Sequence, residues 1–443
     1  MTTHASSLPA RGFPQFALAP ALQRGISALG FTEPTPIQAQ TIAAALDHRD
    51  ILGLAQTGTG KTAAFALPIL QRLYANRRPG PRALILAPTR ELATQIQTEV
   101  RALARFTQLT SLTVFGGIAF GPQVRSLRAR PDVIVACPGR LLDLLQQGEA
   151  KLGSIEVLVL DEADHMFDMG FLPTVHKILA ALPPKRQNLL FSATMPPEVR
   201  ALTGDLLDRP HVVELAHSRP ASTIEHAVYP VRSDRKLDLL RHVLADDGFT
   251  SAIVFLRTKH RARRLADDLS GLGYAAVALQ GNMSQSQRDR AMNGFRDGTF
   301  DVLVATDIAA RGIDVANVSH VINFDVPNTA DAYTHRIGRT GRAERNGRAL
   351  TFVCDEDGGA VRDIERRLGT AIPRCVVPGF EHVAQSSERD RPHALSRPAH
   401  RGGAPGSSNQ WSPRVRRQHG GPSAAGRNRR GRPPIAGRSR PAW

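Results

Sequence analysis

The sequence predicts an α/β protein with two parallel-sheet domains in tandem and a disordered, basic C-terminal tail. Two observations predict the sheets: short, almost entirely apolar strands alternate with helical stretches, and the second half of the chain repeats this layout. Such alternation is typical of parallel sheets that helices cover on both faces. A third observation predicts the tail, because the chain after residue 380 is rich in arginine, glycine, proline and serine and has too few aliphatic side chains to fold.

The first half is expected to begin with helices between residues 13 and 50, which Pro34 and Pro36 interrupt. Strands are expected at short apolar runs, and helices at longer stretches with helical spacing of the apolar residues. On this basis the strands lie at 51–54, 83–86, 112–115, 133–136, 157–160 and 188–191, and the helices at 63–73, 91–105, 140–146 and 172–182.

The second half is expected to have a similar series of elements. Its strands lie at 253–256, 275–279, 302–305, 318–324 and 349–354, and its helices at 261–269, 286–295 and 329–339. The loop after the first of these strands, Arg257 to Lys259, has no phosphate-binding glycines. A glycine-rich loop of that kind occurs in the first half, so we expect one nucleotide site in the cleft between the two domains.

Length and composition indicate a cytoplasmic protein of more than one domain. At 443 residues the chain is long enough for two or three cores. No apolar run approaches the roughly 18–20 residues of a membrane span, and the N-terminus has no apolar stretch of signal-peptide length. Three widely spaced cysteines fit a reducing compartment. The expected segments are a disordered N-terminus (1–12), a first domain (13–207), a linker (208–222), a second domain (223–380) and the tail (381–443).

Charge is unevenly distributed. The tail has 13 arginines, no lysine and three acidic residues, a net charge of +10, which leaves +7 of the total +17 for residues 1–380. This excess points to a polyanionic partner. Trp411 and Trp443 lie among these arginines, so we hypothesise that the tail binds RNA through phosphate contacts and base stacking. The alternative is a solvated extension with incidental tryptophans.

The stretch between the strand at 51–54 and the helix that follows matches a phosphate-binding loop. Glycines there let main-chain N–H groups surround phosphate oxygens at a helix N-terminus. Lys61 is expected to reach the β- and γ-phosphates of ATP, and the Thr62 hydroxyl to bind Mg²⁺. The predicted nucleotide-binding residues of this loop are Ala55, Gln56, Thr57, Gly58, Thr59, Gly60, Lys61 and Thr62.

Two acidic residues, Asp161 and Glu162, follow the apolar strand at 157–160. Ligands of open α/β sheets bind at the carboxyl ends of the strands. Asp161 is therefore predicted to hold Mg²⁺, and Glu162 to act as the base for an attacking water. An acidic pair at this position can also serve only as a helix cap, but its place after a phosphate-binding loop favours an ATPase.

Asp161-Glu162-Ala163-Asp164 spells the name of the DEAD-box ATP-dependent RNA helicases, which the chain resembles across residues 13–342. The resemblance implies two RecA-like domains, RNA-stimulated ATP hydrolysis, local non-processive unwinding of short RNA duplexes, and remodelling of RNA or RNA–protein complexes. Residues 30–38 resemble the family's Q motif, so Gln38 would bind the adenine edge and Phe13 would stack on its face. Residues 363–380 resemble the bacterial RhlE-type branch.

The resemblance also implies RNA contacts. Those of the first domain come from Pro88, Thr89, Arg90, Gly117, Pro138, Gly139 and Arg140, at strand ends where loops suit phosphates and sugars rather than bases. Those of the second domain come from Arg257, Gly281 and Thr306. Cys137 stands where the family usually has threonine, and since a thiol is a poor donor we expect a weaker contact with RNA. Gln280, in place of the usual histidine, is a mild change.

Further residues take roles in catalysis and coupling by the same resemblance. Gly312 and Asp314 would contact the nucleotide. Arg339 and Arg342 would be arginine fingers, which reach the γ-phosphate across the cleft and act with Lys61, Asp161 and Glu162. The residues that would couple hydrolysis to strand separation are Asp164, Ser192, Thr194, His335 and Arg336.

The expected partner is RNA, single-stranded or in short duplexes, with little sequence preference in a monomeric core and with ATP and Mg²⁺ as cofactors. Ribosomal and messenger RNA complexes both stay open. One alternative is a DNA-directed helicase of the same superfamily, against which Gln38 and the Asp-Glu-Ala-Asp spelling weigh. The other is a non-enzymatic RNA clamp, which loss of the base or the fingers would favour, but Glu162, Arg339 and Arg342 are present.

Overall fold

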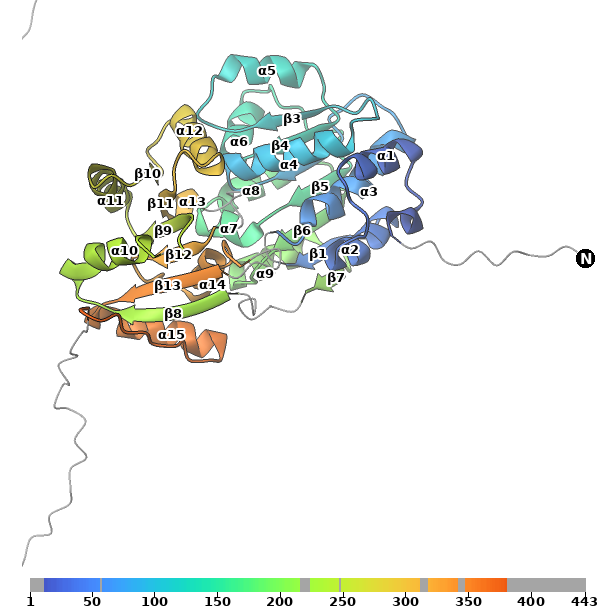
Figure 1. Cartoon of the computed structure of the whole chain (residues 1–443). Helices are drawn as coiled ribbons and strands as arrows, with labels where there is room; N and C mark the ends of the chain where they lie inside the picture. Colours follow the sequence, from blue (N-terminus) through green and yellow to red (C-terminus); the bar gives the residue numbers. More distant parts are fainter. Residues whose placement is uncertain are drawn as a thin grey trace, which may run out of the picture. The chain divides into compact units, whose positions relative to one another are not determined.

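The computed structural model describes residues 12–55, 58–215, 224–246, 248–310, 318–341 and 347–380. These residues form two parallel sheets with flanking helices, within one compact unit of the chain (Figure 1). The predicted fold class is thereby confirmed. We call the parts around the two sheets the first lobe (12–215) and the second lobe (224–380). Within the described residues, no helix is long and apolar enough to cross a membrane.

The first sheet has seven parallel strands in the order β3-β4-β2-β5-β6-β1-β7. Their bounds are β1 (Ile51–Leu54), β2 (Ala83–Leu86), β3 (Ser111–Val114), β4 (Val133–Ala136), β5 (Val157–Leu160), β6 (Gln187–Ser192) and β7 (His211–Glu214). Side chains alternate between the two faces of a strand. Ile85 accordingly belongs to one core, whereas Leu84 and Leu86 belong to the other.

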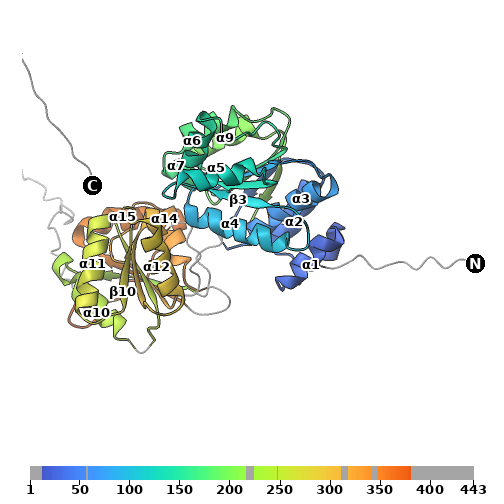
Figure 2. The same ribbon diagram turned by 90° about the horizontal axis from the view of Figure 1, so that it is seen from above.

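Helices cover both faces of the first sheet, as Figure 2 shows for α3 and α4 on one side and α5 and α6 on the other. One core is completed by η1 (Phe13–Phe16), α1 (Pro20–Ala28), α2 (Pro36–Leu46), α3 (Lys61–Ala75) and α4 (Arg90–Leu103). The other is completed by α5 (Phe120–Arg128), α6 (Pro138–Gln146), α7 (Ala163–Asp168), α8 (Leu172–Leu179) and α9 (Pro197–Leu206). The strands are thus buried on both sides, which explains their nearly continuous apolar sequence.

The edge strand β7 lies inside the stretch predicted as a linker, 208–222. Its main chain pairs in parallel with β1, with His211 opposite Ile51. Val213 is fully buried, but Val212 is 52% exposed. Because this edge strand buries so little, its sequence lacks the apolar run that marks the other strands. The linker prediction is therefore corrected for 211–214, which belong to the first sheet.

The second sheet has six parallel strands in the order β10-β11-β9-β12-β13-β8. They are β8 (Ile224–Pro230), β9 (Ala252–Leu256), β10 (Ala276–Leu279), β11 (Val302–Thr306), β12 (His320–Asn323) and β13 (Gly347–Val353). Helices α10 (Lys236–Leu244) and α11 (Lys259–Gly271) cover one face. The other face packs against α12 (Gln285–Arg296), α13 (Asp307–Ala310), α14 (Ala330–Ile337) and α15 (Gly358–Leu368).

The arrangement of the strands places the predicted site residues of the first lobe at one edge. Strands β2, β5, β6 and β1 are consecutive neighbours, so their carboxyl ends lie side by side. The glycine-rich loop follows β1, and Thr89, Asp161 and Thr194 follow β2, β5 and β6. This edge is where open α/β sheets bind their ligands.

Candidate functional site

The glycine-rich loop joins β1 to α3, and a hydrogen bond from Lys61 connects its two ends. Gly58 and Gly60 have φ of 89° and 91°, a left-handed conformation that glycine adopts without strain. Lys61, the first residue of α3, is 6% exposed, and its Nζ donates a hydrogen bond to the Ala55 carbonyl at 2.8 Å. Thr62 follows in the first turn of α3. Gln56 and Thr57 lie outside the described residues.

The N-terminus of α2 holds this loop from the side. Gln38 Nε2 donates to the Gly60 carbonyl at 3.1 Å, and Thr35 Oγ1 donates to the Thr59 carbonyl at 2.9 Å. Gln38 Oε1 in turn accepts from the main-chain N–H of Thr35 at 3.0 Å. Both polar atoms of the Gln38 amide are therefore held beside the glycine-rich loop. This is a suitable position for the predicted contact with adenine.

The acidic residues at the end of β5 are buried together. Asp161 is 2% exposed and Glu162 and Asp164 are each 7% exposed. Burial raises the pKa of the Asp161 carboxyl to about 6, an effect that the positive charge of Lys61 opposes and the negative charge of Glu162 reinforces. Glu162 has φ of 54° and ψ of 55°, which is uncommon for a residue with a side chain. A concentration of negative charge thus lies next to the glycine-rich loop.

Asp164 connects the acidic motif to the end of β6. Its Oδ2 accepts hydrogen bonds from both the N–H and the Oγ1–H of Thr194, each at 2.9 Å. The main-chain N–H of Asp164 donates to Ser192 Oγ at 3.2 Å, and Ser192 Oγ donates to the Thr194 carbonyl at 2.7 Å. These three residues of the predicted coupling set therefore form one network.

Residues of both lobes line a cavity of about 120 Å³ beside this network. The first lobe contributes Glu162, Asp164 and Thr194 among others. The second contributes His335 and Arg339, from α14 and the turn after it, together with Thr329 and Asp331. Predicted catalytic and coupling residues that are far apart in the sequence thus line one space. Gly312, Asp314 and Arg342 lie outside the described residues.

A second cavity, of about 270 Å³, lies beyond the ends of β2 and β4. A side chain at Gly117 would overlap the guanidinium of Arg90, so this glycine allows the close approach of the loop that follows β3. Arg140 donates to the Ile118 carbonyl at 3.2 Å and lies over the Phe120 ring. Of the predicted RNA-binding residues, the cavity is lined by Pro88, Thr89, Arg90, Gly139, Arg140 and Gly281.

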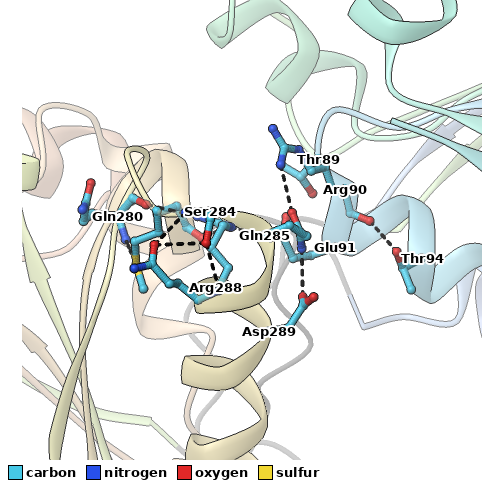
Figure 3. A network of polar contacts seen from close by, with 12 residues as sticks. Thr89, Arg90, Glu91, Thr94, Gln280, Ser284, Gln285, Arg288 and Asp289 are labelled. Carbon is cyan, nitrogen blue, oxygen red and sulfur yellow. Dashed lines mark hydrogen bonds and ion pairs between the residues drawn. The ribbon is translucent and has the colours of Figure 1, made fainter. Parts of the chain in front are cut away.

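Polar contacts between α4 and α12 join the two lobes at this cavity (Figure 3). Arg90 Nη1 donates to Gln285 Oε1 at 3.0 Å. Arg288 Nε donates to Glu91 Oε1 at 2.7 Å, with 11% of the arginine and 15% of the glutamate side chain exposed. Arg288 also donates to the Ala309 carbonyl at 3.2 Å. Glu91 and Gln285 belong to stretches that the family resemblance relates to RNA, and Arg288 had no predicted role. Their contacts across the lobes were not predicted, because nothing local marks residues that meet in this way.

The comparisons with known proteins agree with this geometry. The profile of the DEAD/DEAH box helicase family matches residues 35–202, and that of the helicase conserved C-terminal domain matches residues 235–344. The DEAD-box ATP-dependent RNA helicase CshA of Geobacillus kaustophilus is 39% identical over 378 residues, which cover 85% of this chain and 81% of that protein. CshA of Bacillus subtilis is 40% identical over 378 residues, 85% of this chain and 76% of that protein. The chain belongs to the DEAD-box helicase family.

Solved structures match this DEAD-box helicase across both lobes. S. cerevisiae Dbp5 bound to RNA and ADP BeF3 is 34% identical with a TM-score of 0.75, over 83% of this chain and 96% of that one. Mss116p bound to ssRNA and AMP-PNP is 27% identical with a TM-score of 0.75, over 85% and 81% of the two chains. The RecA-like architecture and the family are confirmed, whereas the RhlE-type branch stays a prediction.

The structure places Arg336, a coupling residue by the family resemblance, among partners of its own lobe. Its guanidinium makes a bidentate ion pair with Asp307, with both N–O distances at 2.6 Å. It also donates to Asn323 Oδ1 at 3.1 Å and to the Asp325 carbonyl at 2.8 Å, and it lies over the Phe255 ring. All these partners belong to the second lobe. Arg336 is 3% exposed and does not reach the acidic motif.

The remaining predicted residues of the helicase have mixed positions. Phe13 is 3% exposed and packs against Phe16 and Phe31 with ring centroids 6.3 Å away, so stacking on adenine requires part of this packing to open. Pro138 begins α6 and is buried, and Thr306 ends β11 and is 8% exposed. The Arg257 guanidinium, which is half exposed, lies 3.9 Å from Asp357 and outside the second cavity.

Cys137 of the helicase lies at the N-cap of α6 and lines the second cavity. It makes no side-chain capping hydrogen bond. Burial is the main reason why the pKa of its thiol rises to about 12, so the sulfur stays protonated. A neutral thiol with a weak donor thus occupies a position beside Thr89, Arg90 and Arg140.

Proposed function

We propose that this chain is an ATP-dependent RNA helicase, in which RNA-stimulated ATP hydrolysis drives local, non-processive unwinding of short duplexes and remodelling of RNA or RNA–protein complexes. The observation that carries the proposal is the cavity between the lobes. It is lined by Glu162 and Thr194 of the first lobe and by His335 and Arg339 of the second. The candidate base and the coupling network come from the first lobe, and the candidate arginine finger comes from the second, so the site needs both lobes.

The phosphates of ATP are assigned to the loop of residues 55–62. Its left-handed glycines let main-chain N–H groups approach phosphate oxygens, and the α3 N-terminus favours negative charge. The Lys61 ammonium, now seated on the Ala55 carbonyl, would turn to the phosphates. Gln38 retains one amide N–H and one carbonyl lone pair for the adenine edge, because its other donor and acceptor positions are used by Gly60 and Thr35.

Mg²⁺ is assigned to Thr62 and Asp161, and the residues present fit it. Asp161 and Glu162 are 2% and 7% exposed, and the positive charge of Lys61 offsets only part of the burial that raises the pKa of Asp161. A further cation beside these carboxylates would therefore be stabilising. When bound, Mg²⁺ would neutralise charge on the transferring phosphates.

Glu162 is the proposed base that accepts a proton from the attacking water. Arg339 is a proposed finger that stabilises negative charge on the γ-phosphate, with Arg342 as the second finger by resemblance. A finger contributes a factor of about 10³–10⁵ to the rate. Hydrolysis is therefore slow unless the second lobe contacts the first. RNA that binds both lobes favours this contact, which is the proposed origin of RNA stimulation.

RNA is assigned to the second cavity, where arginines and loop N–H groups gather at strand ends. Such groups contact phosphates and sugars and carry little sequence information. We therefore propose an RNA partner with little sequence preference in the core, which leaves ribosomal and messenger RNA complexes open.

The domain limits 13–207 and 223–380 remain proposals, with β7 extending the first lobe to Glu214. A cytoplasmic location is also proposed. All three cysteines, Cys137, Cys354 and Cys375, are free thiols, and reduced thiols fit a reducing compartment.

Steady-state ATP hydrolysis with and without single-stranded RNA tests the function, with Glu162→Gln as the control variant. We expect RNA to stimulate turnover in the wild type, and the variant to lose turnover while it still binds ATP and RNA. Stimulation by single-stranded DNA to the same extent would point to a DNA-directed helicase. Tight, ATP-dependent RNA binding without turnover would point to an RNA clamp instead.

A further inference from the structure

His165, the residue after the acidic motif, contacts the candidate base and has no role in the function proposed above. Its Nδ1 lies 3.1 Å from Glu162 Oε2, and 7% of the histidine and 10% of the glutamate side chain are exposed. We propose that His165 is a positioning residue, which holds the Glu162 carboxylate in the orientation that proton transfer requires. The inference rests on the proposed function, because it acts through the base of that reaction.

The Glu162 side chain needs such support for two reasons. Its backbone is in the left-handed region, with φ of 54°, which persists for a non-glycine residue only where the surroundings hold it. Its side chain also has three rotatable bonds, and a base must lie within hydrogen-bond reach of the proton that it accepts. A misplacement of about 1 Å in an active site lowers the rate by roughly 100-fold. A buried partner on the next turn of α7 restricts the carboxylate to one place.

The hydrogen bonding of His165 agrees with this role. A carboxylate only accepts, so Nδ1 is the donor. In the neutral imidazole Nε2 is then an acceptor, and it is buried without a hydrogen-bond partner among the described residues. A buried polar atom without a partner is unfavourable. An apolar side chain would fill the same space without that cost, so the contact with Glu162 is the feature that the imidazole adds.

His165 also lies between the base and the coupling network. Its main-chain N–H donates to Asp164 Oδ1 at 3.0 Å, while the other oxygen of Asp164 accepts from Thr194. The same residue therefore contacts two acids of the motif, one through its ring and one through its backbone. Substitution of the side chain removes the ring contact and leaves the backbone contact in place.

The test compares two variants of the full-length chain in RNA-stimulated ATP hydrolysis. His165→Phe keeps a ring of similar size without a donor, and we expect kcat to fall by about 10- to 100-fold while KM for ATP stays nearly constant. His165→Asn places an amide nitrogen where Nδ1 lies, and we expect it to retain most of the wild-type kcat. Should His165→Phe unfold, as thermal unfolding and binding of an ATP analogue would reveal, His165→Gln replaces it, because its amide reaches only the Nε2 position.

A double-mutant cycle with Glu162→Gln separates positioning from a structural role. If His165 acts through Glu162, His165→Phe should not lower the residual turnover of Glu162→Gln any further. An unchanged kcat in His165→Phe, or losses that multiply in the double variant, would overturn the inference and leave the helicase proposal intact. A wild-type chain without RNA-stimulated turnover would instead overturn the helicase proposal and this inference with it.

Discussion

Replacement of Arg288 by alanine should weaken the contact between the lobes and raise the RNA concentration that is needed to stimulate ATP turnover. Its Nε lies 2.7 Å from Glu91 Oε1, and the two side chains are 11% and 15% exposed. Loss of one partner leaves the other charge buried and uncompensated, which costs about 3–5 kcal/mol in buried pairs. Since neither group is fully buried, we take the lower end, about 3 kcal/mol, which at about 1.4 kcal/mol per factor of ten corresponds to roughly 100-fold in the equilibrium for lobe contact.

The assay is ATP turnover as a function of single-stranded RNA concentration, with nucleotide binding measured separately. We expect Arg288→Ala to raise the half-saturating RNA concentration by roughly 100-fold, whereas binding of an ATP analogue to the first lobe stays unchanged. Arg290→Ala, an exposed arginine of the same helix, is the matched control and should behave like the wild type.

The ion pair is isolated by a second cycle. Glu91→Ala and Arg288→Ala should have similar effects, and the double variant should lose little more than either, because the interaction can be removed only once. Losses that add in free energy would mean that the two residues act independently. In that case the reasoning from the ion pair would be refuted.

Three further predictions follow from individual positions. Gly60→Ala should lower ATP affinity by at least about 10-fold, because its φ is 91° and a Cβ would lie 2.6 Å from Gln38 Nε2. The control is Gly148→Ala, which separates backbone strain from steric overlap: φ there is 73°, and no atom lies within 4 Å of the added Cβ. Cys137→Thr should stabilise α6 by about 1 kcal/mol through an N-cap hydrogen bond, which thermal unfolding measures. The added hydroxyl should also bind a phosphate and raise RNA affinity by roughly 10-fold, so unchanged RNA affinity would contradict this contact. Truncation after Phe380 should make RNA affinity less dependent on salt. With about six arginine–phosphate contacts, the tail accounts for a loss of RNA affinity of a few hundred-fold between 50 and 200 mM salt. Equal salt slopes with and without the tail would refute its role in RNA binding.

The sequence was sufficient to predict those parts of the fold that local chemistry dictates. Strands such as β2 and β5 are buried on both faces and so are apolar throughout, and the glycine-rich loop needs its glycines for left-handed main chain. Strand β7 escaped prediction because only its main chain joins the sheet, with Val212 half exposed. Strand β8 was missed because this edge strand of the second sheet includes Glu225 and His226, so its sequence also lacks a continuous apolar run.

The site residues also differ in whether local sequence could predict them. Asp161, Glu162 and Lys61 could be predicted because their roles depend on places at strand ends and helix starts. The pairing of Glu91 with Arg288 could not, since the residues are far apart in the sequence and either one alone looks like an ordinary charge on a helix. Contacts between lobes are a property of tertiary structure. The single glycine-rich loop predicted a site between the domains, but only the family resemblance named the residues of the second lobe that would complete it.

The contacts of Arg336 within the second lobe point to an indirect role in coupling. Its ion pair with Asp307 and its hydrogen bond to Asn323 fix α14 against the ends of β11 and β12. His335, in that helix, and Arg339, in the turn after it, line the cavity opposite Glu162. In the proposed mechanism, an arginine that holds this helix would determine whether the finger Arg339 can reach a phosphate in the first lobe. We therefore propose that Arg336 acts on the coupling between the lobes through the helix that it anchors, and that its own charge need not cross the cleft.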